Sequence, residues 1–212
     1  MFIPDEYRLD DAATAYALIG EIRTGSLVTV TPGGLPEVSH LPFLADPPGV
    51  AAGAGGTLTG HVDRRNPQWR GLATDPRCLV TFLGPQAHVS PSWYGTRPRA
   101  PTWLYVAVHV HGTATLVEDP QALRAMVERL SRELEPAGSG WEPGQIVPYT
   151  ERLMQYIAGF TIAIERIETQ VRLGQANSPE DRRRVLAGLS EGGPGARQVA
   201  ALIRRLMPLP AG

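Results

Sequence analysis

The segment VAVHVHGTATL, from Val106 to Leu116, carries the clearest pattern in the chain, a strict alternation between two sets of side chains. One set begins with three valines, and the other contains His109 and His111. Successive side chains of a β-strand point to opposite faces of a sheet, so this period indicates a long strand with one buried face. The expected fold is therefore built on β-structure.

Shorter strand-like segments lie on both sides of this strand and are separated by turn residues. Pro32-Gly33-Gly34 and Gly84-Pro85 are the clearest expected turns. The further strands are expected at residues 26–31, 37–45, 57–62, 78–83, 87–90 and 160–164. Their hairpin-like order, without a regular strand–helix–strand alternation, disfavours a doubly wound sheet. We expect a mainly β, α+β fold, a six-stranded antiparallel barrel with peripheral helices, because closure removes exposed strand edges.

Capping residues mark where several helices begin. Asn66-Pro67, Asp119-Pro120 and Ser178-Pro179 each place a side-chain acceptor before a proline, which is tolerated at the first helical position. Helices are expected at residues 10–22, 66–75, 119–135 and 149–158, and after Ser178 and Pro194. The last two form a C-terminal helical segment. We therefore expect a main domain at 1–176 and a helical appendage at 177–212.

The composition excludes several kinds of site, because all twenty basic residues are arginine. A Walker phosphate loop and a pyridoxal Schiff base both need lysine. Any phosphate must be bound by guanidinium groups, hydroxyls or backbone amides. A net charge of −1 gives no field that favours nucleic acid or an anionic membrane. No apolar run reaches the ~18 residues that span a bilayer, and the lone Cys78 forms no internal disulfide, so a cytoplasmic location is expected.

The segment GHVDRRNPQW, Gly60 to Trp69, joins a strand end to a helix start. Arg64, Arg65 and the backbone amides after Asn66 favour an anion such as a phosphate. The alternative is a plain capped turn with solvated arginines.

A second cluster combines HVSPSWY, His88 to Tyr94, with PTWLY, Pro101 to Tyr105. Aromatic side chains with polar tips can wall a planar ring system while hydroxyls orient its polar edge. The alternative is a barrel rim packed with aromatic side chains. Tyr94, Tyr105, His88 and His109 are candidate acids or bases, but no catalytic residue is marked.

His109 and His111 share one strand face, an arrangement that suits a metal ion. The next carboxylate, Glu118, is too far along the chain for a cupin-like ligand set. No metal site is expected, and surface or interface histidines are the favoured interpretation.

Three motifs occur in order: GHVDRRNPQW from Gly60, GPQAHVSPSWY from Gly84 and PTWLYVAVHVHG from Pro101. With the opening MFIP, the segment SHLPF and the ending RLGQANSPEDRRRVLAGL, they resemble the PaiB family. These are FMN-binding split-barrel proteins, often labelled negative transcriptional regulators and related to pyridoxamine-phosphate-oxidase-like flavoproteins. The resemblance extends from Met1 to about Met207. It implies a split β-barrel and a homodimer with FMN at the subunit interface.

The resemblance also implies which residues bind the cofactor. It places three of them by the flavin phosphate and ribityl chain: His61, Arg64 and Asn66. It places the others around the rest of the flavin, with the last two approaching from a strand end: Ser90, Ser92, Trp93, Tyr94, Thr102, Trp103, Arg172 and Gln175.

The chain departs from the family pattern at several positions. Leu104 stands where family members usually carry Asn, and Val171 and Ala176 replace Trp and Asn of a Trp-Lys-Leu-Ser-Gln-Asn motif. Arg172 keeps the charge of the motif's Lys, but a guanidinium has a different reach. Asp63 replaces a small residue in the phosphate motif.

Two classes of function follow from the resemblance. The first is a flavin-dependent oxidoreductase, in which a small-molecule substrate or a nicotinamide approaches the flavin and the protein tunes its chemistry. The second is a PaiB-like transcriptional regulator. The sequence has no helix-turn-helix signature and no basic stripe, so direct DNA binding has little support and regulation would act through a ligand or partner. A split barrel that has lost its flavin is the third alternative.

Overall fold

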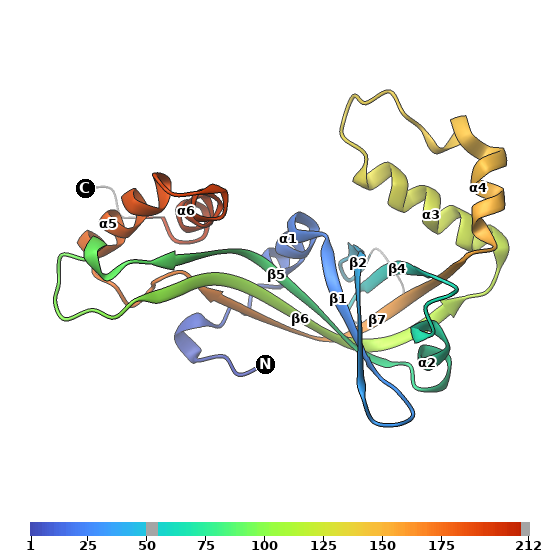
Figure 1. The fold of residues 1–212 in the computed structure, drawn as a ribbon, viewed down its shortest axis with the longest axis horizontal. Coiled ribbons are helices and arrows are strands. Elements are labelled where there is room, and N and C mark those ends of the chain that lie inside the picture. Colours follow the sequence, from blue (N-terminus) through green and yellow to red (C-terminus); the bar gives the residue numbers. More distant parts are fainter. Residues whose placement is uncertain (50–54, 209–212) are drawn as a thin grey trace. The chain divides into compact units, whose positions relative to one another are not determined.

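The computed structural model describes residues 1–49 and 55–208 and contains one antiparallel sheet (Figure 1). Within the described residues, seven strands follow the order β2-β1-β5-β6-β7-β4-β3 across the sheet. Their bounds are β1 Thr24–Val30, β2 Pro36–Pro42, β3 Leu44–Asp46, β4 Thr57–Asp63, β5 Arg77–Val89, β6 Thr102–Val117 and β7 Ile157–Arg172. The predicted class, a mainly β, antiparallel α+β fold with surrounding helices, is confirmed, and the sheet has seven strands where a six-stranded barrel was expected.

The chain forms two compact units. Unit 1 comprises residues 1–11, 83–108 and 168–212, and unit 2 comprises residues 12–82 and 109–167. Strands β5, β6 and β7 are each divided between the two units, because each contains one of the boundaries. The predicted domain boundary between residues 176 and 177 stays a prediction.

Unit 2 contains a core of aromatic and aliphatic side chains. Phe43 packs edge-on against both Phe82 and Phe160, with ring centroids 5.7 and 6.3 Å apart. Such edge-to-face contacts are favourable beyond the area that they bury. The helices of this unit are α1 Ala12–Ile22, α2 Gln68–Thr74, α3 Pro120–Leu134 and α4 Val147–Met154, with a 3-10 turn, η3, at Pro143–Ile146.

Unit 1 contains the C-terminal helices, α5 Pro179–Ser190 and α6 Pro194–Leu206, and the short 3-10 helices η1 Asp5–Tyr7 and η2 Pro91–Trp93. Helix α5 packs closely on η2 at Gly188. A Cβ atom at Gly188 would lie only 2.5 Å from Cδ2 of Trp93, so the indole needs the bare backbone there. None of the helices in the described part of the chain is long and apolar enough to cross a membrane.

The Gly84-Pro85 turn expected from the sequence is wrong, because the strands predicted at 78–83 and 87–90 form one strand, β5. Strand β1 pairs with β5 only between Leu79 and Thr81 in the described register. Pro85 lies beyond that pairing, where a missing backbone N–H breaks no ladder with β1. The single strand predicted at 37–45 is instead divided at Phe43, which separates β2 from β3.

Candidate functional site

The segment after β4 contains two adjacent arginines, Arg64 and Arg65, whose side chains have different partners. Asp63 accepts from Arg65, with Nη2 and Oδ2 2.6 Å apart, and this contact lowers the pKa of the carboxyl group to about 2. Arg65 is therefore neutralised locally. Arg64 makes no ion pair in the described part of the chain, and its guanidinium lies 5.5 Å from the ring centroid of Trp69. Arg64 is the cation left to meet an external anion.

Arg64 lines a cavity of about 320 Å³ in unit 2. Its backbone N–H donates to the Tyr156 carbonyl at 2.8 Å, and its carbonyl accepts from Nε1 of Trp69 at 3.0 Å. The backbone at Arg64 is thus held from both sides. The lining residues are Arg64, Trp69, Leu116, Val117, Glu118, Ala158 and Gly159.

His61 and Asn66 lie in the same motif but use their side chains differently. Nδ1 of His61 is buried without a hydrogen-bond partner among the described residues, and burial lowers the pKa of the imidazole. Asn66 accepts from the Gln68 N–H at 3.0 Å and donates from Nδ2 to Ser39 Oγ at 2.7 Å. The Asn66 side chain thus bonds the first backbone N–H of α2, but the N-cap residue is Pro67, one position later than the sequence predicted. The buried histidine nitrogen remains an unused polar group.

The SPSW segment of unit 1 folds on itself. Ser90 caps η2 by accepting from the Ser92 N–H at 3.2 Å, and the two hydroxyl oxygens are 2.8 Å apart. Trp93 packs on α5 at Gly188, as described above. Trp103 is 46% exposed, and its Nε1 donates to Gln86 Oε1 at 2.9 Å. Their flavin contacts stay predictions.

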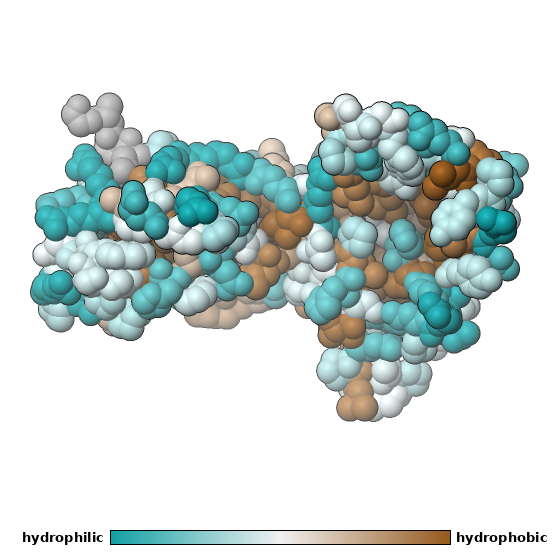
Figure 2. Space-filling view, turned by 45° about the horizontal axis from the view of Figure 1, so that its top comes forward, coloured by the Kyte–Doolittle hydropathy of each residue, from teal (hydrophilic) through white to brown (hydrophobic). Residues whose placement is uncertain are grey.

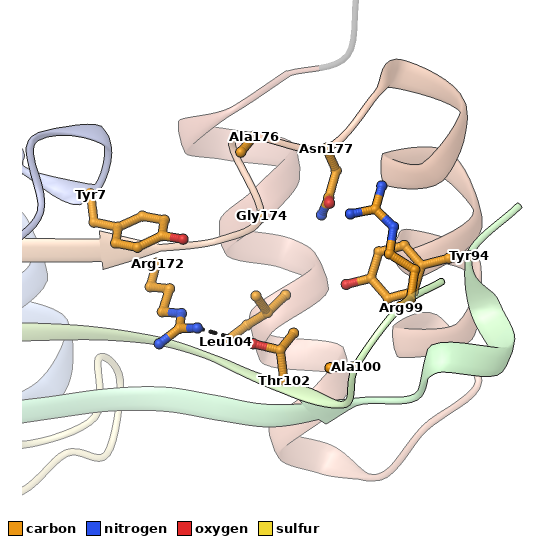
Figure 3. A pocket seen from close by; sticks show the side chains of 10 residues that line it. All are labelled: Tyr7, Tyr94, Arg99, Ala100, Thr102, Leu104, Arg172, Gly174, Ala176 and Asn177. Atoms are coloured by element: carbon orange, nitrogen blue, oxygen red, sulfur yellow. Dashed lines mark hydrogen bonds between the residues drawn. The ribbon is translucent and has the colours of Figure 1, made fainter. Parts of the chain in front are cut away.

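Three other predicted residues, Tyr94, Thr102 and Arg172, line one pocket of about 250 Å³ in unit 1 (Figure 3). The sequence analysis did not select most of the other lining residues, which are Tyr7, Arg99, Ala100, Leu104, Gly174, Ala176 and Asn177. For Arg99, the only signal in the sequence is the basic composition of its segment, GTRPRAP, from Gly95 to Pro101. Nothing near Tyr7 in the sequence connects it with a strand more than 150 residues later.

Two arginine–tyrosine pairs flank this pocket (Figure 3). The Arg172 guanidinium lies 5.4 Å from the ring centroid of Tyr7, and its Nη2 donates to Thr102 Oγ1 at 3.1 Å. The Arg99 guanidinium lies 4.8 Å from the ring centroid of Tyr94. Stacking on an aromatic face holds a guanidinium in place without using all of its N–H donors.

Gln175 closes the turn that follows β7 and does not line the pocket. Its Oε1 accepts from the Leu173 N–H at 3.0 Å, and its Nε2 donates to the Val171 carbonyl. Gly174 has a φ of 85°, which favours glycine over any other residue. The turn therefore presents the backbone of Gly174, and not the Gln175 amide, to the pocket.

The departures from the family pattern have distinct places in the structure. Leu104 and Ala176 both line the pocket of unit 1, and Leu104 is only 2% exposed. Val171 is buried. Two positions expected to carry amides thus supply apolar surface to the pocket.

No group of three or more His, Cys, Asp or Glu side chains among residues 1–49 and 55–208 is arranged to hold a metal ion. His109 and His111 each interact with other groups of the protein.

A family model described as "Putative FMN-binding domain" matches residues 1–166, more than three quarters of the chain. The chain belongs to this FMN-binding family. FMN is accordingly its cofactor. Protease synthase and sporulation protein PAI 2 of Bacillus subtilis, the PaiB protein, is 32% identical over 208 residues, covering 96% of each chain. An uncharacterized protein of Emericella nidulans is 29% identical and covers 80% of this chain and 81% of its own.

Solved structures share the fold of this FMN-binding protein. The FAD- and heme-binding protein of Mycobacterium smegmatis matches with a TM-score of 0.60 and 15% identity, covering 82% of this chain and 78% of its own. The flavocytochrome Anf3 of Azotobacter vinelandii matches with a TM-score of 0.58 and 14% identity, covering 78% and 69%. At these identities the likeness supports the split-barrel fold alone.

The donors of the FMN-binding protein fit the chemistry of the cofactor. A phosphate needs a cation, and unit 2 offers the guanidinium of Arg64 at a cavity. The same unit contains the buried, unpartnered Nδ1 of His61, which does not line that cavity. A planar ring needs flat apolar faces with polar groups at its edge, and unit 1 offers Tyr94, Trp103 and Thr102.

Proposed function

We propose that the protein is an FMN-dependent oxidoreductase that acts on a small molecule as a homodimer, with the flavin at the subunit interface. The observation that carries the proposal is Arg64, a guanidinium without a carboxylate partner among the described residues, lining a cavity in a chain of the FMN-binding family. Glu118 lines the same cavity but forms no ion pair with Arg64.

The proposed cofactor contacts follow the two sets of donors. His61, Arg64 and Asn66 bind the phosphate and the ribityl chain, and the cavity at Arg64, about 320 Å³, suits that part of the flavin. The ring is bound by the hydroxyl and aromatic groups, with Arg172 and Gln175 at the strand end. These residues are Ser90, Ser92, Trp93, Tyr94, Thr102, Trp103, Arg172 and Gln175.

Bound FMN supplies the redox chemistry, because its ring accepts and releases electrons and hydride. The side chains of this protein bind the cofactor, orient it and restrict the access of water. The guanidinium of Arg64 compensates the phosphate charge, while neutral His61 offers a hydrogen bond without adding charge.

An exposed apolar strip on the β1–β2 hairpin supports the homodimer. Val28 pairs with Val38, and Val30 with Pro36, so all four side chains lie on one face. Val30 is 56% exposed and Val38 is 51% exposed. Figure 2 shows apolar colour at the tip of this hairpin, among hydrophilic neighbours. Contiguous exposed apolar side chains of this kind mark association surfaces.

The proposal is tested by dialysing the purified protein against excess FMN and then removing free flavin. We expect a yellow protein with flavin absorbance, at one FMN per chain. Under anaerobic conditions, reduced nicotinamide should bleach that absorbance, and air should restore it. A protein that binds no FMN after dialysis contradicts the cofactor assignment, and bound FMN that no reduced nicotinamide bleaches contradicts nicotinamide as electron donor.

A regulatory function is the second candidate, because the Bacillus subtilis relative is named for protease synthesis and sporulation, which are cellular processes. Two arginines of the C-terminal helices are engaged within the protein: Arg184 with Glu180 at 2.8 Å, and Arg204 with Ser190 Oγ at 2.8 Å. We therefore propose that any regulation acts through a ligand or a partner protein. DNA retarded in a gel at physiological salt would contradict this and favour direct binding.

A further inference from the structure

The pocket of unit 1 has one unneutralised positive charge. Arg99 is paired with Asp181, whose side chain is 1% exposed, at 2.8 Å between Nη2 and Oδ2. The Arg172 guanidinium has no carboxylate partner in the described part of the chain, and its only hydrogen bond there is the one to Thr102. No acidic side chain lines the pocket. A ligand with a single negative charge would therefore balance the site.

Uncharged donors converge on the same space. Figure 3 shows the hydroxyls of Tyr7 and Tyr94 and the amide of Asn177 directed into the pocket. Neither hydroxyl has a hydrogen-bond partner among residues 1–49 and 55–208. Hydroxyl groups that the fold leaves unused at a cavity are available to a ligand.

The remaining walls are apolar and the pocket is small. Ala100, Leu104 and Ala176 contribute no polar side-chain atoms to the lining. The volume of about 250 Å³ lies below the ~300–1,000 Å³ that is usual for cofactor pockets. It suits a single small ring with a polar substituent, bound beside the flavin ring that Tyr94, Thr102 and Arg172 are proposed to contact. Because that flavin ring is neutral, it leaves the positive charge of Arg172 for a second ligand.

We propose that this pocket binds the substrate of the oxidoreductase, and that the substrate is a small planar monocarboxylate. The carboxylate accepts from the Arg172 guanidinium and from a tyrosine hydroxyl, and the ring lies on the Leu104 wall. A guanidinium matches the two oxygens of a carboxylate in its flat, forked geometry. That the ligand is a substrate rests on the proposed function. The binding of the ligand to the pocket does not require the flavin.

A compact inorganic anion is the competing ligand. A phosphate dianion carries more charge than Arg172 alone compensates and leaves the apolar wall without a contact. The carboxylate of a ring compound balances the Arg172 charge, and its ring contacts the apolar wall. Benzoate and nicotinate carry a ring and one negative charge, whereas benzamide has the same shape as benzoate without the charge.

The experiment measures binding of benzoate, nicotinate, benzamide and inorganic phosphate to the FMN-treated dimer, by calorimetry and by the rise in Tm. We expect at least one of the two carboxylates to bind, with benzamide and phosphate at least about tenfold weaker, as expected for losing a charged hydrogen bond. Arg172→Gln should weaken carboxylate binding at least about tenfold, Arg172→Lys should recover part of it, and Tyr7→Phe should weaken it about threefold.

Arg77→Gln is the matched control, because Arg77 is exposed and pairs only with Asp75 outside the pocket. It should leave carboxylate binding within about twofold of the wild-type value. If neither carboxylate gives heat or a rise in Tm while FMN binds, the pocket assignment is overturned and the proposed function stands. Equal binding of benzoate and benzamide, tighter binding of phosphate, or an unchanged Arg172→Gln variant would overturn it as well. Carboxylate binding without FMN binding would retain the pocket and reject the oxidoreductase.

Discussion

At the scale of single residues, Arg64 and Arg65 show how one contact separates two neighbouring charges. The ion pair with Asp63 neutralises Arg65, while Arg64 stays available at its cavity. A phosphate at Arg64 would therefore contribute to FMN affinity but not to riboflavin affinity, because riboflavin has no phosphate.

We predict that Arg64→Gln weakens FMN binding by about tenfold or more, since a charged hydrogen bond is lost. Riboflavin binding should change by less than about threefold, so the preference for FMN should nearly vanish. The measurement is quenching of flavin fluorescence on titration with protein. Arg65→Gln is the control and should keep most of the preference. Equal losses for both flavins would show that Arg64 does not contact the phosphate.

Cys78 provides a second prediction at this scale. Burial raises the pKa of its thiol to about 12, and its Sγ donates to the Gly112 carbonyl at 3.5 Å. At pH 8 only about one thiol in ten thousand is a thiolate, and the thiolate is the reactive form. We expect no measurable alkylation of the native protein by iodoacetamide, and full alkylation in denaturant. Rapid labelling of the folded protein would contradict the buried, unreactive assignment.

At the scale of elements, Asp181 connects α5 with the loop that follows η2. Its carboxylate accepts from the Gly95 N–H at 2.7 Å, from Thr96 Oγ1 at 2.6 Å and from the Arg99 guanidinium. Hydrogen bonds from Thr96 and Gly95 and from Arg99 lower the pKa of the carboxyl to about 2. The helix and the loop are therefore held together by one ionised side chain.

This linkage predicts a defined dependence on pH. A carboxyl whose pKa is lower in the folded state stabilises the protein above its ordinary pKa, near 4, and the stabilisation is lost as pH falls towards 2. Asp181→Asn should lower the Tm by about 5 °C or more at pH 7 and flatten its decline between about pH 4 and pH 2. Asp75→Asn, which breaks an exposed pair with Arg77, should change the Tm far less. Identical pH profiles for wild type and Asp181→Asn would refute the linkage.

Helix starts could be predicted from the sequence, whereas the continuity of a strand could not. The helix starts at Asp119 and Ser178 were predictable because each side chain bonds a backbone N–H only three residues later. The continuity of β5 through Pro85 was not, since proline reads as a turn unless the pairing of the neighbouring strand is known.

The candidate site also has a part that the sequence predicts and a part that it does not. The Arg64 segment was predictable as a contiguous motif, whereas the pocket of unit 1 brings together Tyr7, Tyr94 and Arg172 from three distant parts of the chain. No local pattern encodes such a contact. The neutralisation of Arg65 by Asp63 escaped the sequence analysis because both residues looked solvated.

At the scale of the whole molecule, the apolar strip of the half-buried Val28 and the exposed Val30, Pro36 and Val38 bears on assembly. Val38→Glu places a charge on this strip, and burying an unpaired charge is strongly unfavourable. We predict that this variant shifts the dimer towards monomer by at least about tenfold in dissociation constant. Light scattering coupled to size-exclusion chromatography gives the mass.

Ala137→Glu adds the same charge at another exposed position and should leave the dimer intact. If Val38→Glu stays dimeric at the same dilution as the wild type, the hairpin strip is not the interface. If the wild type is itself a monomer, the homodimer proposal fails.

The close fit of Trp93 against Gly188 has a practical consequence for following this protein in solution. An indole packed on a helix backbone fluoresces at a shorter wavelength than one in water. The emission maximum of Trp93 therefore reports whether α5 is packed against η2. Detachment of α5 would therefore appear as a red shift of the Trp93 emission. The emission wavelength of Trp93 thus reports on the packing of α5 against η2.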